Sequence, residues 1–288
     1  MSKVKLPAKS LHPGLYVTAT PIGNLADITY RAVDVLSLVD LIVCEDTRVS
    51  AKLLSHYEIS TKCIAYHDHN AARMRPQILE KLKSGAAIAL ISDAGTPLIS
   101  DPGFKLVRAA AELGVNIISV PGPSSPIAAL SIAGLPSDRF LFLGFLPAKT
   151  HARRQVLSEV SKINSTLVFL ETGPRLVKML GDVIDVLGPR QGVVAREMTK
   201  LYEEVSRGTI DQLIERFGAV ARVKGEIVVI IEPPAGKSLE ADEVDALILE
   251  HLSAASLKEA VAQVAIRTGI SRRKIYTRAL SLSGALEK

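Results

Sequence analysis

Residues 86–120 read AAIALISDAGTPLISDPGFKLVRAAAELGVNIISV, and this stretch decides the fold class. The apolar runs 86–92 and 115–120 each predict a strand. Between them, residues 103–113 predict a helix that Gly114 ends. Two strands joined through a helix favour parallel pairing, because a parallel pair needs a long crossover connection. We therefore expect an α/β protein in which helices cover a mainly parallel sheet.

The same alternation continues on both sides of this stretch. Upstream, it predicts strands over 14–19, 40–44 and 62–66 and helices over 29–38, 48–56 and 70–83. Downstream, it predicts helices over 124–133, 151–162 and 174–187 and strands over 139–145, 166–170, 192–195 and 225–232. We expect this second half to be more mixed, with antiparallel pairs. The glycine- and proline-containing segment 134–138 predicts a domain boundary, and Pro233–Lys237 predicts a linker.

Length and composition fit two domains and a small extra one. The chain has 288 residues, of which 48% are hydrophobic, so a full apolar core can form. We expect a disordered leader over 1–12, an N-terminal α/β domain over 13–133, a C-terminal α/β domain over 134–234 and a helical RNA-binding module over 238–288. Cys44 and Cys63 form no CxxC pair, which argues against a disulfide framework or zinc knuckle and favours buried free thiols.

No targeting or membrane segment is apparent in the sequence. Residues 1–13 contain three lysines but no continuous apolar run. The longest apolar stretches have the length of strands, far below the ~20 residues that a membrane span needs. We therefore expect a cytoplasmic protein that does not contact a membrane.

The positive charge is concentrated at the C-terminus. The formal net charge is +5, and residues 251–288 alone carry seven basic and two acidic residues, so the first 250 residues balance to zero. After an acidic stretch over 240–250, helical periodicity runs from 256 to 282 with Gly269 at a turn, which is typical of a helix-turn-helix. We expect Arg272, Arg273 and Lys274, which open its second helix, to contact a polyanion.

Four loops follow the ends of predicted strands, where open α/β sheets bind their ligands. They are Thr20-Pro-Ile-Gly-Asn-Leu25, Glu45-Asp-Thr-Arg48, the twelve residues from Ser92 to Gly103, and Pro121-Gly-Pro-Ser-Ser125. Small residues let a ligand approach the backbone closely, and the third loop combines them with two aspartates. No GxGxxG, Walker or GxSxG motif is present, which disfavours a dinucleotide, an ATPase or an α/β-hydrolase site. His67-Asp-His69 lacks a further clustered ligand, so we expect no metal site.

Seven segments, taken in order, resemble the ribosomal RNA methyltransferases of the tetrapyrrole methylase superfamily. They are TPIGNLAD (20–27), EDTR (45–48), SDAGTPLISDPG (92–103), VPGPS (120–124), GFLP (144–147), AREMTK (195–200) and KGE (224–226). The resemblance runs from about Gly14 to the end of the chain and includes the basic tail. It implies the two-domain tetrapyrrole-methylase (class III methyltransferase) fold with a small C-terminal helix-turn-helix module, and a homodimer.

The resemblance also implies an activity and a cofactor. It implies methylation of a cytidine ribose 2′-OH in the decoding region of 16S rRNA, within the small ribosomal subunit, with S-adenosylmethionine (SAM) bound between the two α/β domains. The cofactor contacts it implies are Pro21, Ala94, Gly95, Thr96, Ile99, Ser124, Ser125, Glu171 and Met198. The family usually has a histidine where this chain has Pro174, so we expect Arg175 to carry the role of that segment.

The charged residues near these loops supply the remaining predictions. We expect the catalytic residues to be Asp46, Arg48, Asp101 and Lys200. We expect Arg175, Arg196 and Lys224 to grip RNA phosphates. Two alternatives stay open at this point: a methylase of the same fold that acts on a small molecule such as a tetrapyrrole precursor, and a non-catalytic nucleic-acid-binding regulator.

Overall fold

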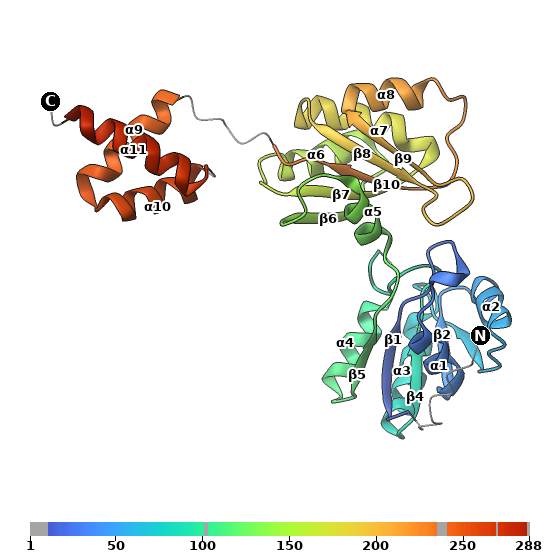
Figure 1. The fold of residues 1–288 in the computed structure, drawn as a ribbon. Helices are drawn as coiled ribbons and strands as arrows, with labels where there is room; N and C mark the ends of the chain where they lie inside the picture. The colour runs from blue at the N-terminus through green and yellow to red at the C-terminus, as the bar shows by residue number, and fades with distance from the viewer. Residues whose placement is uncertain (1–10, 101–102, 235–240, 269, 287–288) are drawn as a thin grey trace, which may run out of the picture. The chain divides into compact units, whose positions relative to one another are not determined.

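The computed structural model describes residues 11–100, 103–234, 241–268 and 270–286. Contacts divide the chain into two units, Met1–Pro234 and Ala235–Lys288. The first unit contains two five-stranded sheets, and the second is helical (Figure 1).

The first sheet is parallel throughout, as predicted. Its strand order is β3-β2-β4-β1-β5. The strands are β1 (Gly14–Thr18), β2 (Leu41–Cys44), β3 (Cys63–Ala65), β4 (Ala87–Leu90) and β5 (Ile117–Val120). Because β1, β4 and β2 are the three inner strands, the loops that follow them meet at the centre of one sheet edge.

Helices cover both faces of this sheet, also as predicted. One apolar cluster joins α1 (Tyr30–Leu38) and α2 (Thr47–His56) to one face, where Ile42 of β2 is fully buried. A second cluster joins α3 (Ala71–Lys83) and α4 (Phe104–Glu112) to the opposite face, where Val43 is fully buried. Neighbouring β2 residues thus serve opposite faces, which explains why this strand is a continuous apolar run.

The second sheet is mixed and has the order β6-β7-β10-β8-β9. Only β6 and β7 pair in parallel, and the other neighbours are antiparallel. The strands are β6 (Phe140–Phe145), β7 (Thr166–Thr172), β8 (Gln191–Arg196), β9 (Glu204–Thr209) and β10 (Glu226–Ile231). As a result, the first residue of β10, Glu226, lies beside the last residue of β7, Thr172.

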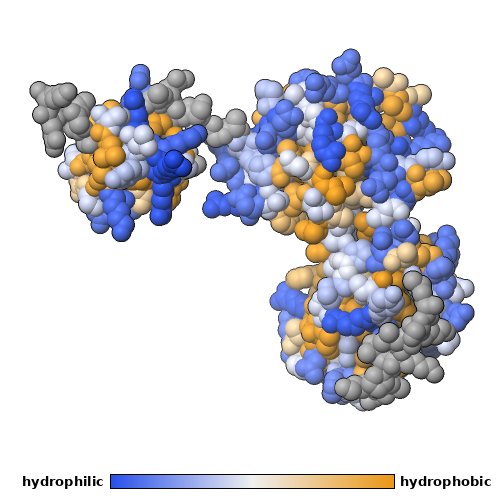
Figure 2. Space-filling view, in the orientation of Figure 1, coloured by the Kyte–Doolittle hydropathy of each residue, from blue (hydrophilic) through white to orange (hydrophobic). Residues whose placement is uncertain are grey.

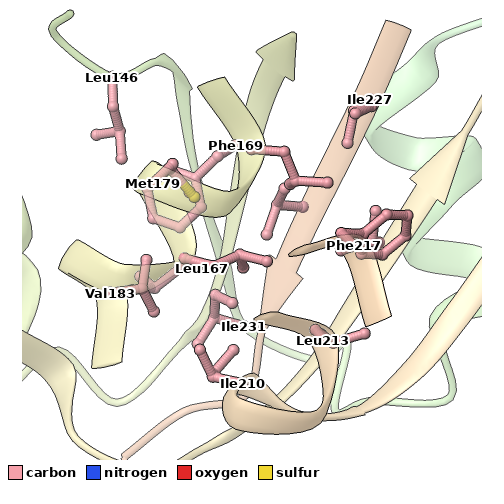
Figure 3. Close-up of a cluster of buried hydrophobic side chains, with 14 of the residues drawn as sticks. Leu146, Leu167, Phe169, Met179, Val183, Ile210, Leu213, Phe217, Ile227 and Ile231 are labelled. Atoms are coloured by element: carbon pink, nitrogen blue, oxygen red, sulfur yellow. The ribbon is translucent and has the colours of Figure 1, made fainter. Parts of the chain in front are cut away.

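Opposite faces of the second sheet pack against helices from different parts of the chain. On one face, α6 (Thr150–Val160), α7 (Gly173–Leu187) and α8 (Ile210–Gly218) bury the cluster in Figure 3, which includes Phe169 and Leu213. On the other face, α5 (Ser125–Ala133) packs against β7, β8 and β10. Arg207 of β9 also donates hydrogen bonds to the carbonyl oxygens of Ile132 and Ala133. The helix that follows the last strand of the first sheet therefore belongs to the packing of the second.

Besides the short 3-10 helix η1 (Leu25–Asp27), three elements of the described chain were not predicted. β9 is a half-buried edge strand with the sequence EVSRGT, so it shows no clear alternation. The helix α8 does carry a usable start: Thr209 and Gln212 form a capping box, and that spacing is visible in the sequence. The acidic stretch hides α9 (Ala241–Ala254), whose apolar residues Val244 and Ile248 are nevertheless buried.

The helical unit contains α9, α10 (Leu257–Thr268) and α11 (Arg272–Leu286). The three helices share a small core that includes Val261, Val264 and Ile275. The two predicted helices of the helix-turn-helix are thus present. Figure 2 shows strongly hydrophilic side chains beside apolar ones on the visible face of this unit.

Candidate active site at the strand ends

The loop after β4 is tied to the loop after β1 by backbone hydrogen bonds. The amides of Thr20 and Gly95 each donate to the other's carbonyl oxygen, over 2.9 and 3.0 Å. Gly95 has a φ of +78°, a conformation that L side chains rarely adopt. Thr96 continues the connection, since its hydroxyl donates to the carbonyl of Pro123 over 3.0 Å. Three of the four predicted loops therefore form one wall at the edge of the first sheet.

A cavity with mostly apolar lining lies against this wall, and we name it the methyl-donor cavity after the cofactor that the sequence resemblance implies. Residues of both α/β halves line it. They are Ile22, Ala94, Ile99, Ser100, Ser125, Phe145, Leu170, Glu171, Thr172, Met198, Gly225, Glu226, Ile227 and Val228. Most of these side chains are apolar, so the cavity suits a largely apolar ligand held by a few polar contacts.

Five of the nine predicted cofactor residues line the methyl-donor cavity. These are Ala94, Ile99, Ser125, Glu171 and Met198. Gly95 and Thr96 instead hold the loops together through the contacts above, and Ser124 is the N-cap residue of α5. Pro21 lines a neighbouring cavity.

The buried Glu171 brings a charge to the methyl-donor cavity. Its Oε1 lies 3.0 Å from Nε of Arg175 and accepts a hydrogen bond from the Thr172 amide. Its Oε2 is buried and, among the described residues, has no hydrogen-bond partner. An unsatisfied buried carboxylate oxygen is costly, so a ligand with a hydrogen-bond donor would be stabilised here.

A second cavity adjoins the first, shares Ile22, Ala94 and Glu226 with it, and is lined by more charged side chains. We name it the substrate cavity after the acceptor that the sequence resemblance implies. Its remaining lining residues are Thr20, Pro21, Gly23, Leu25, Val49, Lys52, Leu53, Asp93 and Lys200. The shared residues make the two cavities neighbours along one wall.

Asp46 and Arg48, both predicted to be catalytic, are paired with each other. Asp46 caps α2 by accepting from the Arg48 amide over 2.8 Å, and its Oδ2 lies 2.6 Å from the Arg48 guanidinium. Hydrogen bonds from Arg48 lower the pKa of Asp46 to about 2. Asp46 is therefore a poor proton acceptor, and its capping role explains its position.

Asp93 lies between Asp46 and the substrate cavity, and was not among the predicted catalytic residues. It lines both the substrate cavity and the depression around Asp46. Its Oδ1 accepts a hydrogen bond from the Asp46 amide over 3.0 Å. Burial raises the pKa of Asp93, and the lowering effect of that hydrogen bond does not outweigh it. The pKa therefore favours Asp93 over Asp46 as a proton acceptor.

Lys200 is held between two carboxylates. Its Nζ lies 2.8 Å from Glu197 and 2.9 Å from Glu226. Burial alone would lower the pKa of Lys200, but hydrogen bonds to these glutamates outweigh it and raise the pKa. Lys200 therefore stays a cation at the wall of the substrate cavity.

The predicted RNA-contacting residues of the first unit differ in whether their side chains already contact other protein groups. Arg175 is engaged internally, since it also donates to the carbonyl of Leu146 over 2.5 Å. Arg196 pairs with Glu204 and donates to the carbonyl of Lys224. The Lys224 side chain itself is exposed. Asp101 lies outside the described residues.

In the helical unit, the three predicted basic residues Arg272, Arg273 and Lys274 are exposed at the start of α11. A shallow depression on the same helix is lined by Ser271, Arg273, Lys274, Thr277, Arg278 and Ser281. Arg278 pairs with Asp245 of α9. Exposed cations at a helix start are available to phosphate groups.

Among the histidines, His67 lines the depression around Asp46 and Asp93. In the described part of the chain, no group of three or more His, Cys, Asp or Glu residues could hold a metal ion. Cys44 is buried as predicted, whereas Cys63 is only half-buried, and the two free thiols lie 3.2 Å apart. Over the same described residues, no helix is long and apolar enough to cross a membrane.

Sequence reasoning missed the part of the methyl-donor cavity that β10 supplies. Gly225, Glu226, Ile227 and Val228 lie at the amino end of this strand. The search at carboxyl ends could not find them, because β10 runs antiparallel to β7 and brings its first residues to the end of β7. The pairing direction was the missing information.

Two solved structures share the fold of the first unit. Diphthine synthase superposes with a TM-score of 0.60 at 13% identity, covering 76% of this chain and 89% of that chain. Uroporphyrin-III C-methyltransferase from Thermus thermophilus, complexed with S-adenosylhomocysteine, superposes with a TM-score of 0.53 at 18% identity, covering 75% and 96%. The first unit thus has the fold of these two enzymes.

Sequence comparisons agree and are more specific. The family model of tetrapyrrole (corrin/porphyrin) methylases matches residues 14–214, and the model of the RsmI C-terminal helix-turn-helix domain matches residues 238–283. Ribosomal RNA small subunit methyltransferase I of Mesorhizobium japonicum is 44% identical over 98% of this chain and 96% of its own length. The Vibrio cholerae protein of that name is 45% identical over 92% and 93%. The chain belongs to the ribosomal RNA small subunit methyltransferase I family of tetrapyrrole methylases.

Proposed function

We propose that the protein transfers a methyl group from SAM to the ribose 2′-OH of a cytidine in the decoding region of 16S rRNA. The observation that carries this proposal is the pair of adjoining cavities. Both are lined largely by apolar atoms; one contains an unsatisfied buried carboxylate oxygen, and the other contains the charged side chains of Asp93 and Lys200. Such a pair suits a small donor on one side and a charged acceptor on the other. The names of the relatives supply small-subunit ribosomal RNA as the acceptor, and the sequence resemblance supplies the cytidine 2′-OH.

The lining residues fit SAM. The α-amino group, the ribose hydroxyls and the adenine amino group of SAM are hydrogen-bond donors. Glu171 Oε2 is a buried acceptor without a protein partner among the described residues. Ala94, Ile99, Ser125 and Met198 would hold the rest of the molecule. When bound, SAM supplies an electrophilic methyl group on a positively charged sulfur.

The protein's own residues then position the acceptor and receive its proton. Lys200, held by Glu197 and Glu226, fixes one wall of the substrate cavity against which the acceptor would lie. Ile22 and Ala94, shared by both cavities, would lie between the two ligands. The free oxygen of Asp93 accepts the hydroxyl proton, because the Asp46 amide holds the other oxygen in place. Positioning of the two reactants supplies most of the remaining acceleration.

The helical unit supplies affinity for RNA in this proposal. Arg272, Arg273 and Lys274 would contact phosphates, with Lys224 on the first unit as a further contact. We also propose that the enzyme is a homodimer in the cytoplasm and acts on the small ribosomal subunit.

The proposal is tested with 30S particles reconstituted from unmodified 16S rRNA transcript. Incubation with tritiated SAM, nuclease digestion and mass spectrometry should yield 2′-O-methylcytidine from one site in the decoding region. A methyl group on a base, or none, would overturn the proposed reaction. Methylation of a tetrapyrrole precursor instead would support the small-molecule alternative. RNA binding without any transferred methyl would support a regulator.

A further inference from the structure

Two large apolar side chains stand exposed on the turn 197–203, which joins β8 to β9. Leu201 is 88% and Tyr202 70% exposed. Single exposed apolar residues are common on protein surfaces. Tyr202 differs from such residues because the turn that carries it is firmly held. Its ring is mostly exposed, so packing within the protein does not explain its position.

The turn is fixed from several directions. The Thr199 amide donates to the Glu203 carboxylate over 2.7 Å, and the Lys200 amide donates to the Glu197 carbonyl over 3.1 Å. From the loop after β1, the Asn24 amide donates to the Thr199 hydroxyl over 3.1 Å. Glu197 and Thr199 have φ values of 50° and 66°, a strained conformation that persists only where the surroundings enforce it.

The turn borders the substrate cavity. Lys200, two residues before Tyr202, lines that cavity. Gly23 permits the approach, since a Cβ at this position would lie 2.6 Å from Cγ of Lys200. Tyr202 is therefore held close to the mouth of the cavity that we assign to the RNA.

Lysines and carboxylates both border the turn, and Lys200 is matched by two of the carboxylates. Lys52 and Lys200 line the cavity, and Lys224 is exposed on the segment before β10. The nearby acids have donors of their own: Glu197 and Glu226 pair with Lys200, and Glu203 accepts from the Thr199 amide. Two exposed side chains are too few for a protein interface, which buries about 800 Å² per partner.

We propose that Tyr202 is the platform on which a base of the RNA substrate stacks when its ribose enters the substrate cavity. This inference rests on the proposed function. A ribose in folded RNA must be splayed out to be reached, and the unstacked base then needs a new partner. Aromatic side chains provide such a partner with little dependence on sequence.

Steady-state methylation of reconstituted 30S particles tests the platform. The substitutions separate the effect of the aromatic ring from the effect of an apolar side chain of similar size. Tyr202→Leu keeps an apolar side chain but loses the ring, and should raise KM for 30S at least about fivefold. Tyr202→Phe keeps the ring and should restore KM to within about twofold of wild type. SAM affinity, measured by calorimetry, should be equal in all three proteins. Equal KM values for the Leu and Phe variants would overturn the proposal.

The absence of tryptophan from the chain allows a direct measurement. Tyr202→Trp introduces the chain's single tryptophan. A stacked base should quench its fluorescence when an unlabelled cytidine oligoribonucleotide is added. The abasic counterpart of that oligoribonucleotide should not quench it. Ile163→Trp is the control, because Ile163 is 40% exposed just before β7, whose opposite end reaches the methyl-donor cavity. That end is roughly 20 Å away along the strand.

The outcomes separate the platform from the proposed function. Quenching of Tyr202→Trp alone supports stacking. Equal signals from both tryptophan variants, with 30S methylation by the wild type intact, would overturn stacking and leave the proposed function standing. Failure of the wild type to methylate 30S would overturn the proposed function and, with it, the platform.

Discussion

The two sheets of the first unit use their charged residues differently. Beside the second sheet, several cations and carboxylates satisfy one another: Arg153 and Arg154 with Asp182, and Arg196 with Glu204. At the edge of the first sheet, Asp93 has one hydrogen bond from a backbone amide and faces a cavity. A charged group whose hydrogen bonds are all made within the protein therefore maintains the fold. A charged group at a cavity with an unused hydrogen-bonding atom is available for chemistry.

The largest expected effect concerns stability and the second sheet. Asp182 is buried and pairs with the buried Arg153 and with Arg154. Asp182→Ala leaves the Arg153 guanidinium without this partner and should lower the free energy of unfolding by about 3–5 kcal/mol. Urea denaturation at pH 7 measures this. A change below about 1 kcal/mol would contradict a structural role for the pair.

The same pair predicts a pH dependence. Burial alone would raise the pKa of Asp182, but hydrogen bonds from Arg154 and Arg153 outweigh it, and the pKa lies below the ordinary 3.8. A lowered folded-state pKa means that the stabilisation is present above pH 3.8 and is lost as the pH falls through the folded-state value. Wild-type stability should therefore decline on acidification below about pH 4 more steeply than that of Asp182→Ala. Parallel curves would argue against this assignment.

The next effect concerns chemistry at the first sheet. Asp93→Asn keeps the size and the acceptor for the Asp46 amide but removes the proton acceptor, so methyl transfer to 30S should fall about 100-fold. SAM affinity and urea stability should stay close to wild type. Asp46→Asn is the matched comparison, and its main expected defect is the loss of the ion pair with Arg48. A larger loss of turnover in Asp46→Asn than in Asp93→Asn would reverse the assignment.

A smaller effect is expected for cofactor binding. Gly95→Trp introduces a bulky side chain at φ +78°, where its Cβ would lie 3.4 Å from Ile22. The displaced wall should weaken SAM binding at least about tenfold, a change of 1.4 kcal/mol. Titration calorimetry measures it, with the exposed Gly218→Ala as control, since a Cβ there meets nothing within 4 Å. Unchanged SAM affinity in Gly95→Trp would show that the cavity assignment is wrong.

The smallest expected effect on activity comes from removing the helical unit. Deletion of residues 240–288 removes the exposed Arg272, Arg273 and Lys274. Methylation of 30S should weaken several-fold, most strongly at low salt, because the lost phosphate contacts contribute most there and the truncated chain depends less on salt. SAM affinity should be unchanged. Turnover on 30S equal to that of the full chain would contradict an RNA-binding role for the helical unit.

The same comparison explains which parts could be predicted from sequence. β2 and β4 are buried on both faces, so each is a clear continuous apolar run. Their parallel direction follows from the helical connections between the strands. β9 escaped because an edge strand with one solvent-facing side needs little apolar sequence. Elements were thus found where burial dictates composition, and were missed where it does not.

The site followed the same rule. Ala94, Ile99 and Ser125 follow parallel strands and were found at the predicted edge. Glu226 was placed there by antiparallel pairing, which sequence periodicity does not specify. Asp93 and Asp46 could not be ranked from sequence, because the distinction lies in which carboxylate Arg48 reaches.

A crystal structure with S-adenosylhomocysteine tests the central claim most directly. The account predicts that the ligand occupies the methyl-donor cavity, with a donor group on Glu171 Oε2 and its sulfur facing Ile22 and Ala94, toward Asp93. A ligand bound in the substrate cavity instead, or with its sulfur turned away from Asp93, would contradict it.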